Sequence, residues 1–307
     1  MKIKKKIVIP AVLSAGSVAA AGGLSAYLAS FVAHGKRQTL EEACEWQKSQ
    51  YDLSFYEDLG KSDYTVDSYD GYTLHVQLCR NPAGGRKYVI ISHGYTDNRY
   101  GAVKYMRTYL EAGYHCIIYD LRGHGLNEPD YCTYSVREAQ DLYTLIQDTR
   151  ARYGLDILLG LHGESLGGAT TCAVLKYEQN LAFAVSDCGF ADISNVLKVA
   201  MKRMHVPGFM LYPTSGMSRL LYGFTYREMQ PVKAIEGNRV PVLFLHGEED
   251  HFIVPDNSRR LQEKTAGYSE LHLIPGAGHA KSVLTEPQLY DTYVKNFLSR
   301  VENGTLA

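Results

Sequence analysis

The sequence contains none of the short motifs that commonly hold metals or nucleotides. It has no CxxC pair, no Cys/His group with zinc-ligand spacing, no HExxH, no P-loop and no GxGxxG. Positive charge is not in excess, because 32 Lys and Arg face 33 Asp and Glu, for a net charge of −1. Proteins that bind nucleic acid draw on such an excess to neutralise phosphates. We therefore expect no metal, no cofactor and no nucleic-acid partner.

Cysteines are few and follow no recognisable framework. Cys79 and Cys116 lie inside apolar runs typical of strands, which favours buried free thiols that act as small hydrophobic side chains. An even number of cysteines in an exported protein keeps one disulfide possible. Cys132 and Cys188 are the cysteines least confined to predicted strands. The sequence does not choose between these alternatives.

Charge is also missing from residues 7–33, a run of 27 residues that follows a Lys-rich start. A helix needs about 20 apolar residues to cross a bilayer. Four lysines precede the run and only Lys36 and Arg37 follow it closely, so the positive-inside rule places the N-terminus in the cytoplasm. Residues 1–33 are therefore predicted to be a single-pass signal anchor in the cell membrane, with an extracytoplasmic body. The alternative is a signal peptide cleaved near Ala21 and a secreted protein.

The rest of the chain has a globular composition, with 45% hydrophobic and 21% charged residues. Residues 34–63 look helical and polar and are predicted to be a stalk, followed by one domain over 64–307. Asp70-Gly71 between two alternating segments predicts a tight hairpin. The predicted strands cover 64–69, 72–80, 87–92, 114–119, 156–161, 182–186, 240–245 and 270–274. The predicted helices cover 98–111, 135–153, 166–178, 256–266 and 286–302.

Apolar strands that alternate with helices predict an α/β fold, with a mostly parallel eight-stranded sheet and helices on both faces. Ligands of such sheets bind beyond the carboxyl ends of the strands. Residues 190–238 interrupt the alternation, and the segment is too long for an ordinary connection and too apolar for a linker. We predict that it forms a small helical lid over the strand ends.

The segment Gly163-Glu164-Ser165-Leu166-Gly167 lies where a predicted strand turns into a predicted helix. This setting is typical of the elbow that presents a nucleophilic serine, because glycines two residues away on each side allow the backbones to pass closely. Ser165 is therefore the predicted nucleophile. The alternative is a glycine-rich turn with a spectator serine.

A serine nucleophile needs a base and an acid that orients the base. His279 lies in a glycine loop after the last predicted strand, and Asp250 follows the strand before it. This places both residues at the strand ends, where His279 is the predicted base and Asp250 the predicted acid. The other candidates for the acid are Asp187, which ends another strand, and Glu248 and Glu249 in the same loop as Asp250.

An oxyanion hole needs two backbone N–H groups aimed at one point. One is expected from Leu166, directly after the nucleophile. The other is expected from Tyr95, in the loop after the first parallel strand. In the loop that carries Tyr95, we interpret His93 as a residue that braces its loop. We interpret the charged segment 120–125 as structural.

These segments occur together in one order: HGYT (93–96), YDLRGHG (119–125), GESLG (163–167), HGEEDHFIVP (246–255) and GAGH (276–279). The set resembles the α/β-hydrolase superfamily, and within it the serine aminopeptidase-like and lysophospholipase-like hydrolases. A form with an N-terminal membrane anchor occurs in Gram-positive bacteria. The resemblance covers roughly residues 64–300. It implies a Ser–His–Asp triad on Ser165, His279 and Asp250, no cofactor, and hydrolysis through an acyl-enzyme.

The predicted function is therefore hydrolysis of carboxylic esters with acyl or lipid-like substrates. A peptidase, aminopeptidase or thioesterase of the same fold is the alternative, with a short peptide as one possible substrate, and a non-catalytic binding module is a distant one. Six basic and three acidic residues make the predicted lid net basic, which argues against holding a substrate ammonium group. The lid also carries five of the seven methionines, which indicates an apolar pocket for varied acyl chains.

Overall fold

The computed structural model describes residues 21–306, and its centre is a single eight-stranded sheet in the order β1-β2-β4-β3-β5-β6-β7-β8. β1 and β2 form the predicted antiparallel hairpin, β2 pairs antiparallel with β4, and the remaining pairs are parallel. This confirms the predicted α/β-hydrolase fold. The strands are β1 (Lys61–Asp67), β2 (Thr73–Cys79), β3 (Lys87–Ser92), β4 (Tyr114–Tyr119), β5 (Leu158–Glu164), β6 (Phe183–Asp187), β7 (Val242–Gly247) and β8 (Ser269–Ile274).

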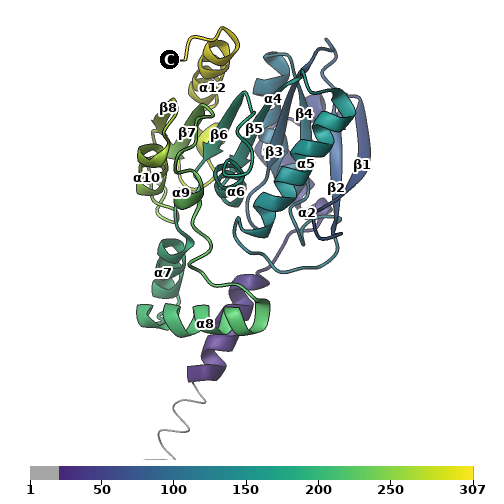
Figure 1. Cartoon of the computed structure of the whole chain (residues 1–307). Coiled ribbons are helices and arrows are strands. Elements are labelled where there is room, and N and C mark those ends of the chain that lie inside the picture. Colours follow the sequence, from purple (N-terminus) through teal and green to yellow (C-terminus); the bar gives the residue numbers. More distant parts are fainter. Residues whose placement is uncertain (1–20, 307) are drawn as a thin grey trace, which may run out of the picture.

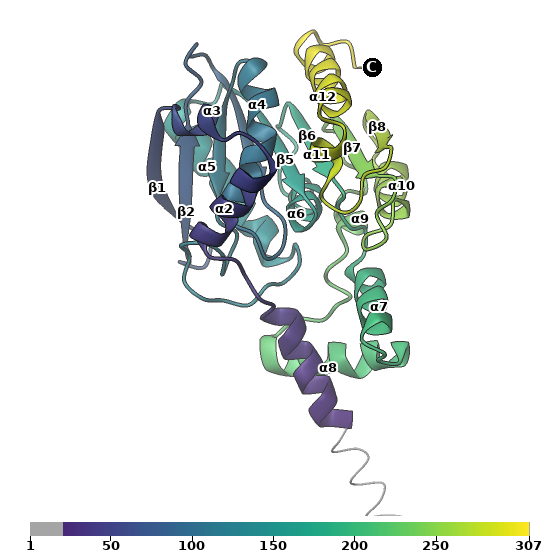
Figure 2. The ribbon, with the colours of Figure 1, turned by 180° about the vertical axis from the view of Figure 1, so that it is seen from behind.

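Helices cover both faces of the sheet, and each face has its own apolar core (Figures 1 and 2). β4, β6 and β7 are buried along their whole length, as expected for a sheet sandwiched between two helical layers. One face carries α5 (Arg137–Tyr153), α6 (Leu166–Val174) and α10 (Asp256–Lys264). The other carries α3 (Ser54–Glu57), η1 (Arg99–Ala102), α4 (Val103–Glu111), α11 (Ser282–Thr285) and α12 (Pro287–Glu302).

The segment predicted to be a lid connects β6 to β7 and holds α7 (Ile193–Arg203), η2 (Gly208–Met210), α8 (Leu211–Tyr222) and α9 (Pro231–Ala234). α7 and α8 extend beyond the end of the sheet in both views (Figures 1 and 2). Asp192 caps α7 by accepting a hydrogen bond from the Ser194 N–H, and Gly223 ends α8 in a left-handed conformation.

Residues 40–63 of the predicted stalk pack on the domain and do not form a separate stalk. α2 (Leu40–Gln50) buries Ala43 and Gln47, and the capping box at its start is complete. Tyr56 in α3 donates a 2.6 Å hydrogen bond to Gln77 of β2, and β1 already begins at Lys61. Residues 40–63 are thus part of the domain, because a helix that reads as polar still presents enough small and apolar side chains to pack on η1.

Residues 21–33 are helical and lie against α8 (Figures 1 and 2). Most of the predicted anchor, residues 1–20, lies outside the described residues. Within 21–306, no helix is both long and apolar enough to cross a membrane. All six cysteines are free, and both Cys132 and Cys188 are buried.

Candidate active site

Ser165 lies in the sharp turn between β5 and α6, with a positive φ of 54° that is unusual for a residue with a side chain. The turn depends on its two glycines. A Cβ on Gly163 would collide with the backbone of Gly167, and one on Gly167 would collide with the carbonyl of Ser92. The Ser165 N–H donates a 2.8 Å hydrogen bond to the carbonyl of Asp187 on β6. The strained backbone is therefore fixed by its neighbours, as expected for a functional turn.

Three residues singled out from the sequence form one hydrogen-bonded chain. Ser165 Oγ lies 3.0 Å from Nε2 of His279, and Nδ1 of the same ring lies 2.6 Å from Oδ2 of Asp250. Because a carboxylate only accepts, Nδ1 donates to Asp250, which leaves the Nε2 lone pair facing the serine hydroxyl. The arrangement can therefore take a proton from Ser165.

Asp250 is almost completely buried, yet its surroundings favour the ionised form. Burial opposes the charge, but the nearby His246 ring, whose Nε2 lies 3.4 Å from Oδ2, and the hydrogen bond from His279 hold the pKa of Asp250 below its ordinary value. The N–H groups of Phe252 and Ile253 also donate to Oδ1, each at 2.9 Å. Sequence reasoning missed His246, although its position at the end of β7 was visible in the chain.

Asp187, the alternative acid, has no hydrogen bond to His279. Its carboxyl accepts hydrogen bonds from Ser282 at 3.1 Å and from Tyr105 at 3.3 Å. Burial, aided by the nearby Glu164 carboxylate, raises the pKa of Asp187 to about 6. Glu164 in turn pairs with the buried Lys104 of α4. This polar cluster adjoins the nucleophile, because Glu164 is the residue before Ser165. No local pattern in the sequence identified Lys104 as part of the cluster.

The two predicted oxyanion donors lie on either side of Ser165. Leu166 is the first residue of α6, where a helix has N–H groups without intrahelical partners. Tyr95 follows Gly94, and a Cβ placed on Gly94 would be only 3.6 Å from that of Ser165. Within residues 21–306, neither the Tyr95 nor the Leu166 N–H donates a hydrogen bond to another group of the protein.

Two cavities of different character meet at Ser165. The first has a volume of about 310 Å³ and is almost entirely apolar. It is lined by Leu28, Phe31, Val32, Gly35, Lys36, Tyr95, Thr96, Tyr134, Ser165, Leu166, Phe190, Ile193, Val196, Leu197, Ala200, Met201, Met204, Phe252 and Ile253. The second, about 240 Å³, is polar and includes Asp97, Lys104 and Lys281. An apolar group and a more polar group can thus both be bound next to one hydroxyl.

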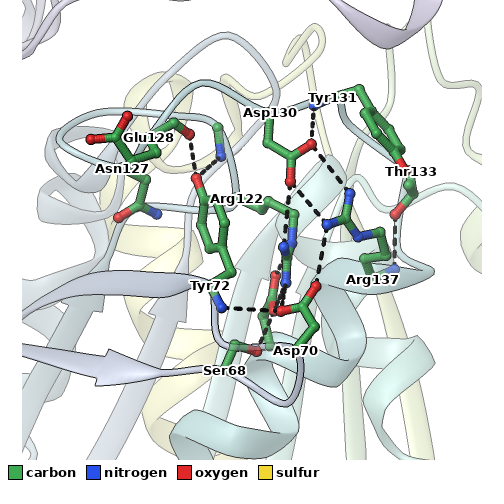
Figure 3. A network of polar contacts seen from close by, with 12 residues as sticks. Ser68, Asp70, Tyr72, Arg122, Asn127, Glu128, Asp130, Tyr131, Thr133 and Arg137 are labelled. Atoms are coloured by element: carbon green, nitrogen blue, oxygen red, sulfur yellow. Dashed lines mark hydrogen bonds and ion pairs between the residues drawn. The ribbon is translucent and has the colours of Figure 1, made fainter. Parts of the chain in front are cut away.

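The charged segment 120–125 is structural, as predicted, and Arg122 within it ties the β1–β2 hairpin to α5. Arg122 is buried and makes two hydrogen bonds to Asp141 of α5, of 2.9 and 2.5 Å. It also reaches Asp70 in the β1–β2 turn at 3.0 Å (Figure 3). His93 braces its own loop, since its Nδ1 donates to the Gly94 carbonyl at 2.7 Å, and it ties that loop to the 120–125 segment, since its Nε2 accepts the Leu121 N–H at 2.9 Å.

One group of described side chains has the spacing of metal ligands, namely Cys188, Asp250 and His279, whose ligand atoms lie within 4.8 Å of one another. Asp250 and His279 already bond to each other. Burial raises the pKa of the Cys188 thiol well above its ordinary value, which disfavours the thiolate that a metal requires. The residues therefore suit proton transfer better than metal binding.

Comparisons with known proteins agree with this fold. Residues 89–290 match the model of the alpha/beta hydrolase family. The chain is 29% identical over 257 residues to the uncharacterized protein YqkD of Bacillus subtilis, covering 81% of this chain and 83% of that protein.

Solved structures with a similar fold include an esterase and the protein Est1E. The Pyrococcus furiosus esterase Pf2001 is 21% identical, with a TM-score of 0.65 over 81% of this chain and 94% of that one. Est1E from Butyrivibrio proteoclasticus is 16% identical, with a TM-score of 0.58 over 78% and 99%. The family match spans well over half of the sequence, so the chain belongs to the alpha/beta hydrolase family.

Proposed function

We propose that the protein is a serine hydrolase that cleaves carboxylic esters with an apolar acyl group. The observation that carries this proposal is the Ser165–His279–Asp250 chain of hydrogen bonds beside an apolar cavity that Ser165 helps to line. One structural neighbour, Pf2001, is an esterase, which is consistent with ester cleavage.

In the first half of the reaction, Ser165 Oγ attacks the ester carbonyl while Nε2 of His279 takes the hydroxyl proton. Asp250 holds the ring in the required tautomer and stabilises its charged form. The N–H groups of Tyr95 and Leu166 bind the oxyanion. The C–O bond to the alcohol then breaks, and His279 returns the proton to the leaving oxygen.

In the second half, His279 takes a proton from water, and the resulting hydroxide attacks the acyl-enzyme. The bond between the acyl carbon and Ser165 Oγ breaks, Oγ recovers the proton, and the free acid leaves. No cofactor or metal enters either half. The same steps serve a thioester, which makes a thioesterase a close alternative.

A peptidase is the second candidate, because Asp97 lines the polar cavity and could hold a substrate ammonium group. Burial raises the pKa of Asp97 to about 6, and Lys104 and Lys281 line the same cavity. Glu164 also lines this cavity, but it is already paired with Lys104, so that Lys281 and the weakly acidic Asp97 disfavour an ammonium ligand. We therefore place esters before aminoacyl amides and keep the serine aminopeptidase-like subgroup as an alternative. A non-catalytic binding module remains the distant one.

For the location of the protein, we propose a single-pass anchor within residues 7–33 and an extracytoplasmic catalytic domain. The support is the uncharged run and the excess of lysines before it. Secretion after cleavage near Ala21 is the alternative.

A panel of p-nitrophenyl esters, a thioester and aminoacyl p-nitroanilides tests the activity on the full chain. We expect ester turnover that is lost in Ser165→Ala, whose small hydroxyl contributes little to packing. Amide turnover without ester turnover would favour the peptidase. No turnover of any substrate would contradict the proposal.

A further inference from the structure

The helix over residues 21–33 has one side that is buried against the domain and one side that is exposed. Its buried side comprises Ser25, Leu28, Ala29, Val32 and Ala33, at the spacing of one helical face. Leu28 and Val32 form part of the wall of the apolar cavity that reaches Ser165. The N-terminal segment is therefore a component of the candidate active site as well as a tether.

The end of this helix is fixed in the domain by specific bonds. Its last carbonyls would otherwise lack partners. The Val32 carbonyl accepts a 2.8 Å hydrogen bond from the Tyr134 hydroxyl, and the Ala33 carbonyl accepts the Cys132 N–H at 3.0 Å. The ring of His34 packs edge-on against Tyr222, the last residue of α8, at 5.4 Å. The helix thus has a fixed position relative to the lid.

The outer side of the same helix exposes large apolar side chains, and so do η2 and α8 beside it. These side chains form what we call the apolar face. It consists of Leu24, Tyr27, Phe31, Phe209, Tyr212 and Leu220, which are 41% to 77% exposed. Large contiguous apolar patches on a protein surface mark binding sites for proteins or membranes.

Three observations identify a lipid bilayer as the partner of this face. The first is continuity, because the uncharged run of residues 7–20 leads directly into the helix that carries Leu24 and Tyr27. The second is composition, since tyrosines at the edge of an apolar surface suit the membrane interface. The third is charge, because the lid has six basic and three acidic residues, and basic side chains next to an apolar face favour anionic lipid headgroups.

Length gives an independent argument. The hydrocarbon core of a bilayer is about 30 Å thick, whereas a helix of fourteen residues such as 7–20 would rise only about 21 Å. An anchor that spans the bilayer must therefore include several residues of the described helix beyond residue 20. That requirement places the start of this helix in the outer leaflet, and α8 crosses the helix between that start and the sheet (Figures 1 and 2).

We propose that the apolar face lies in the outer leaflet, and that acyl esters resident in the bilayer enter the active site along the N-terminal helix. Phe31 and Met204 both line the apolar cavity and are both exposed, so they mark its mouth between this helix and α7. The acyl chain would pass from lipid to Ser165 without crossing water. This inference rests on the proposed esterase function and names its substrate class.

The test compares one fluorogenic ester in two settings, with the full chain reconstituted in phosphatidylcholine–phosphatidylglycerol vesicles. 4-Methylumbelliferyl oleate is embedded in the vesicles, and 4-methylumbelliferyl butyrate is supplied in solution. Leu220→Glu places a charge on the apolar face, away from the cavity. Leu155→Glu is its matched control, because Leu155 is 82% exposed and precedes β5, at the end of the strand opposite Ser165.

We expect Leu220→Glu to lower the rate on the vesicle-bound oleate about tenfold and to leave the rate on soluble butyrate unchanged. Leu155→Glu should change neither rate. On the inner side of the helix, Leu28→Ala should slow both reactions, with the active fraction normalised by titration with a fluorophosphonate.

Failure of the inference is distinguishable from failure of the proposed function. If the wild type cleaves neither ester, the esterase proposal is wrong. If it cleaves both and Leu220→Glu leaves both rates at the wild-type level, the membrane-facing role of the apolar face is wrong. Equal loss on both esters together with a change from dimer to monomer would also overturn it, and would identify the face as a contact between copies.

Discussion

Replacing Met201 by glutamine tests whether the apolar cavity binds the acyl chain of the substrate. Met201 is buried in α7 and lines the cavity that reaches Ser165. Each methylene transferred from water to an apolar site contributes about 0.8 kcal/mol, so the two methylenes that separate butyrate from acetate contribute about 1.6 kcal/mol. At about 1.36 kcal/mol per tenfold change, kcat/KM should rise about 15-fold between these two p-nitrophenyl esters.

In Met201→Gln, an amide without a partner lies among apolar side chains and favours water in the cavity over a hydrocarbon chain. We expect the gain from acetate to butyrate to fall to about fourfold, which corresponds to half of the free energy per methylene. Met217→Gln is the matched control, because Met217 lies on α8 and does not line the cavity. A steep chain-length dependence that survives Met201→Gln, or a strict preference for acetyl esters, would refute the reasoning.

Three further predictions follow from the contacts described above. Asp250→Asn should lower kcat by about four orders of magnitude, because the amide favours the wrong tautomer of His279, while Asp187→Asn should retain most activity; the opposite result in ester assays would identify Asp187 as the acid. Arg122→Met should lower the free energy of unfolding by about 3–5 kcal/mol in urea titrations, because it leaves the buried Asp141 carboxylate without its partner. Burial already raises the pKa of Asp141 to about 6, so this loss of stability should be smaller at pH 5, where the carboxyl is neutral in the folded protein, than at pH 8. An equal loss of stability at both pH values would contradict this prediction. The full chain should fractionate with membranes and its body should be digested by external protease on spheroplasts, whereas a soluble chain that begins near Gly22 would demonstrate cleavage.

The parts of the site that the sequence predicted are those with a local signal. The Ser165 elbow is encoded within five residues, because close backbone packing requires both of its glycines. His279 and Asp250 were predictable because both follow strands, and the carboxyl ends of parallel strands meet at one edge of the sheet. The hairpin at Asp70-Gly71 was predictable from its turn residues for a similar reason.

The parts that were not predictable depend on contacts between distant segments. Lys104 sits in an ordinary amphipathic helix, and only the packing of α4 on the sheet places it against Glu164. The helix over 21–33 reads as part of an anchor, because its uncharged composition does not distinguish a lipid-facing side from a side that packs on the lid. The burial of α2 was missed for the same reason, since Ala43 and Gln47 carry no pattern that separates a packed helix from a stalk.

Labelling with a fluorophosphonate tests the central claim most directly, because the probe reacts only with an activated serine. In the intact full chain, we predict one modified residue by peptide mass spectrometry, Ser165, labelled within minutes at micromolar probe. Labelling should be lost in Ser165→Ala and slowed at least a hundredfold in His279→Ala, since the hydroxyl then lacks its base. Modification of another serine, or a rate at Ser165 that His279→Ala leaves unchanged, would contradict the account.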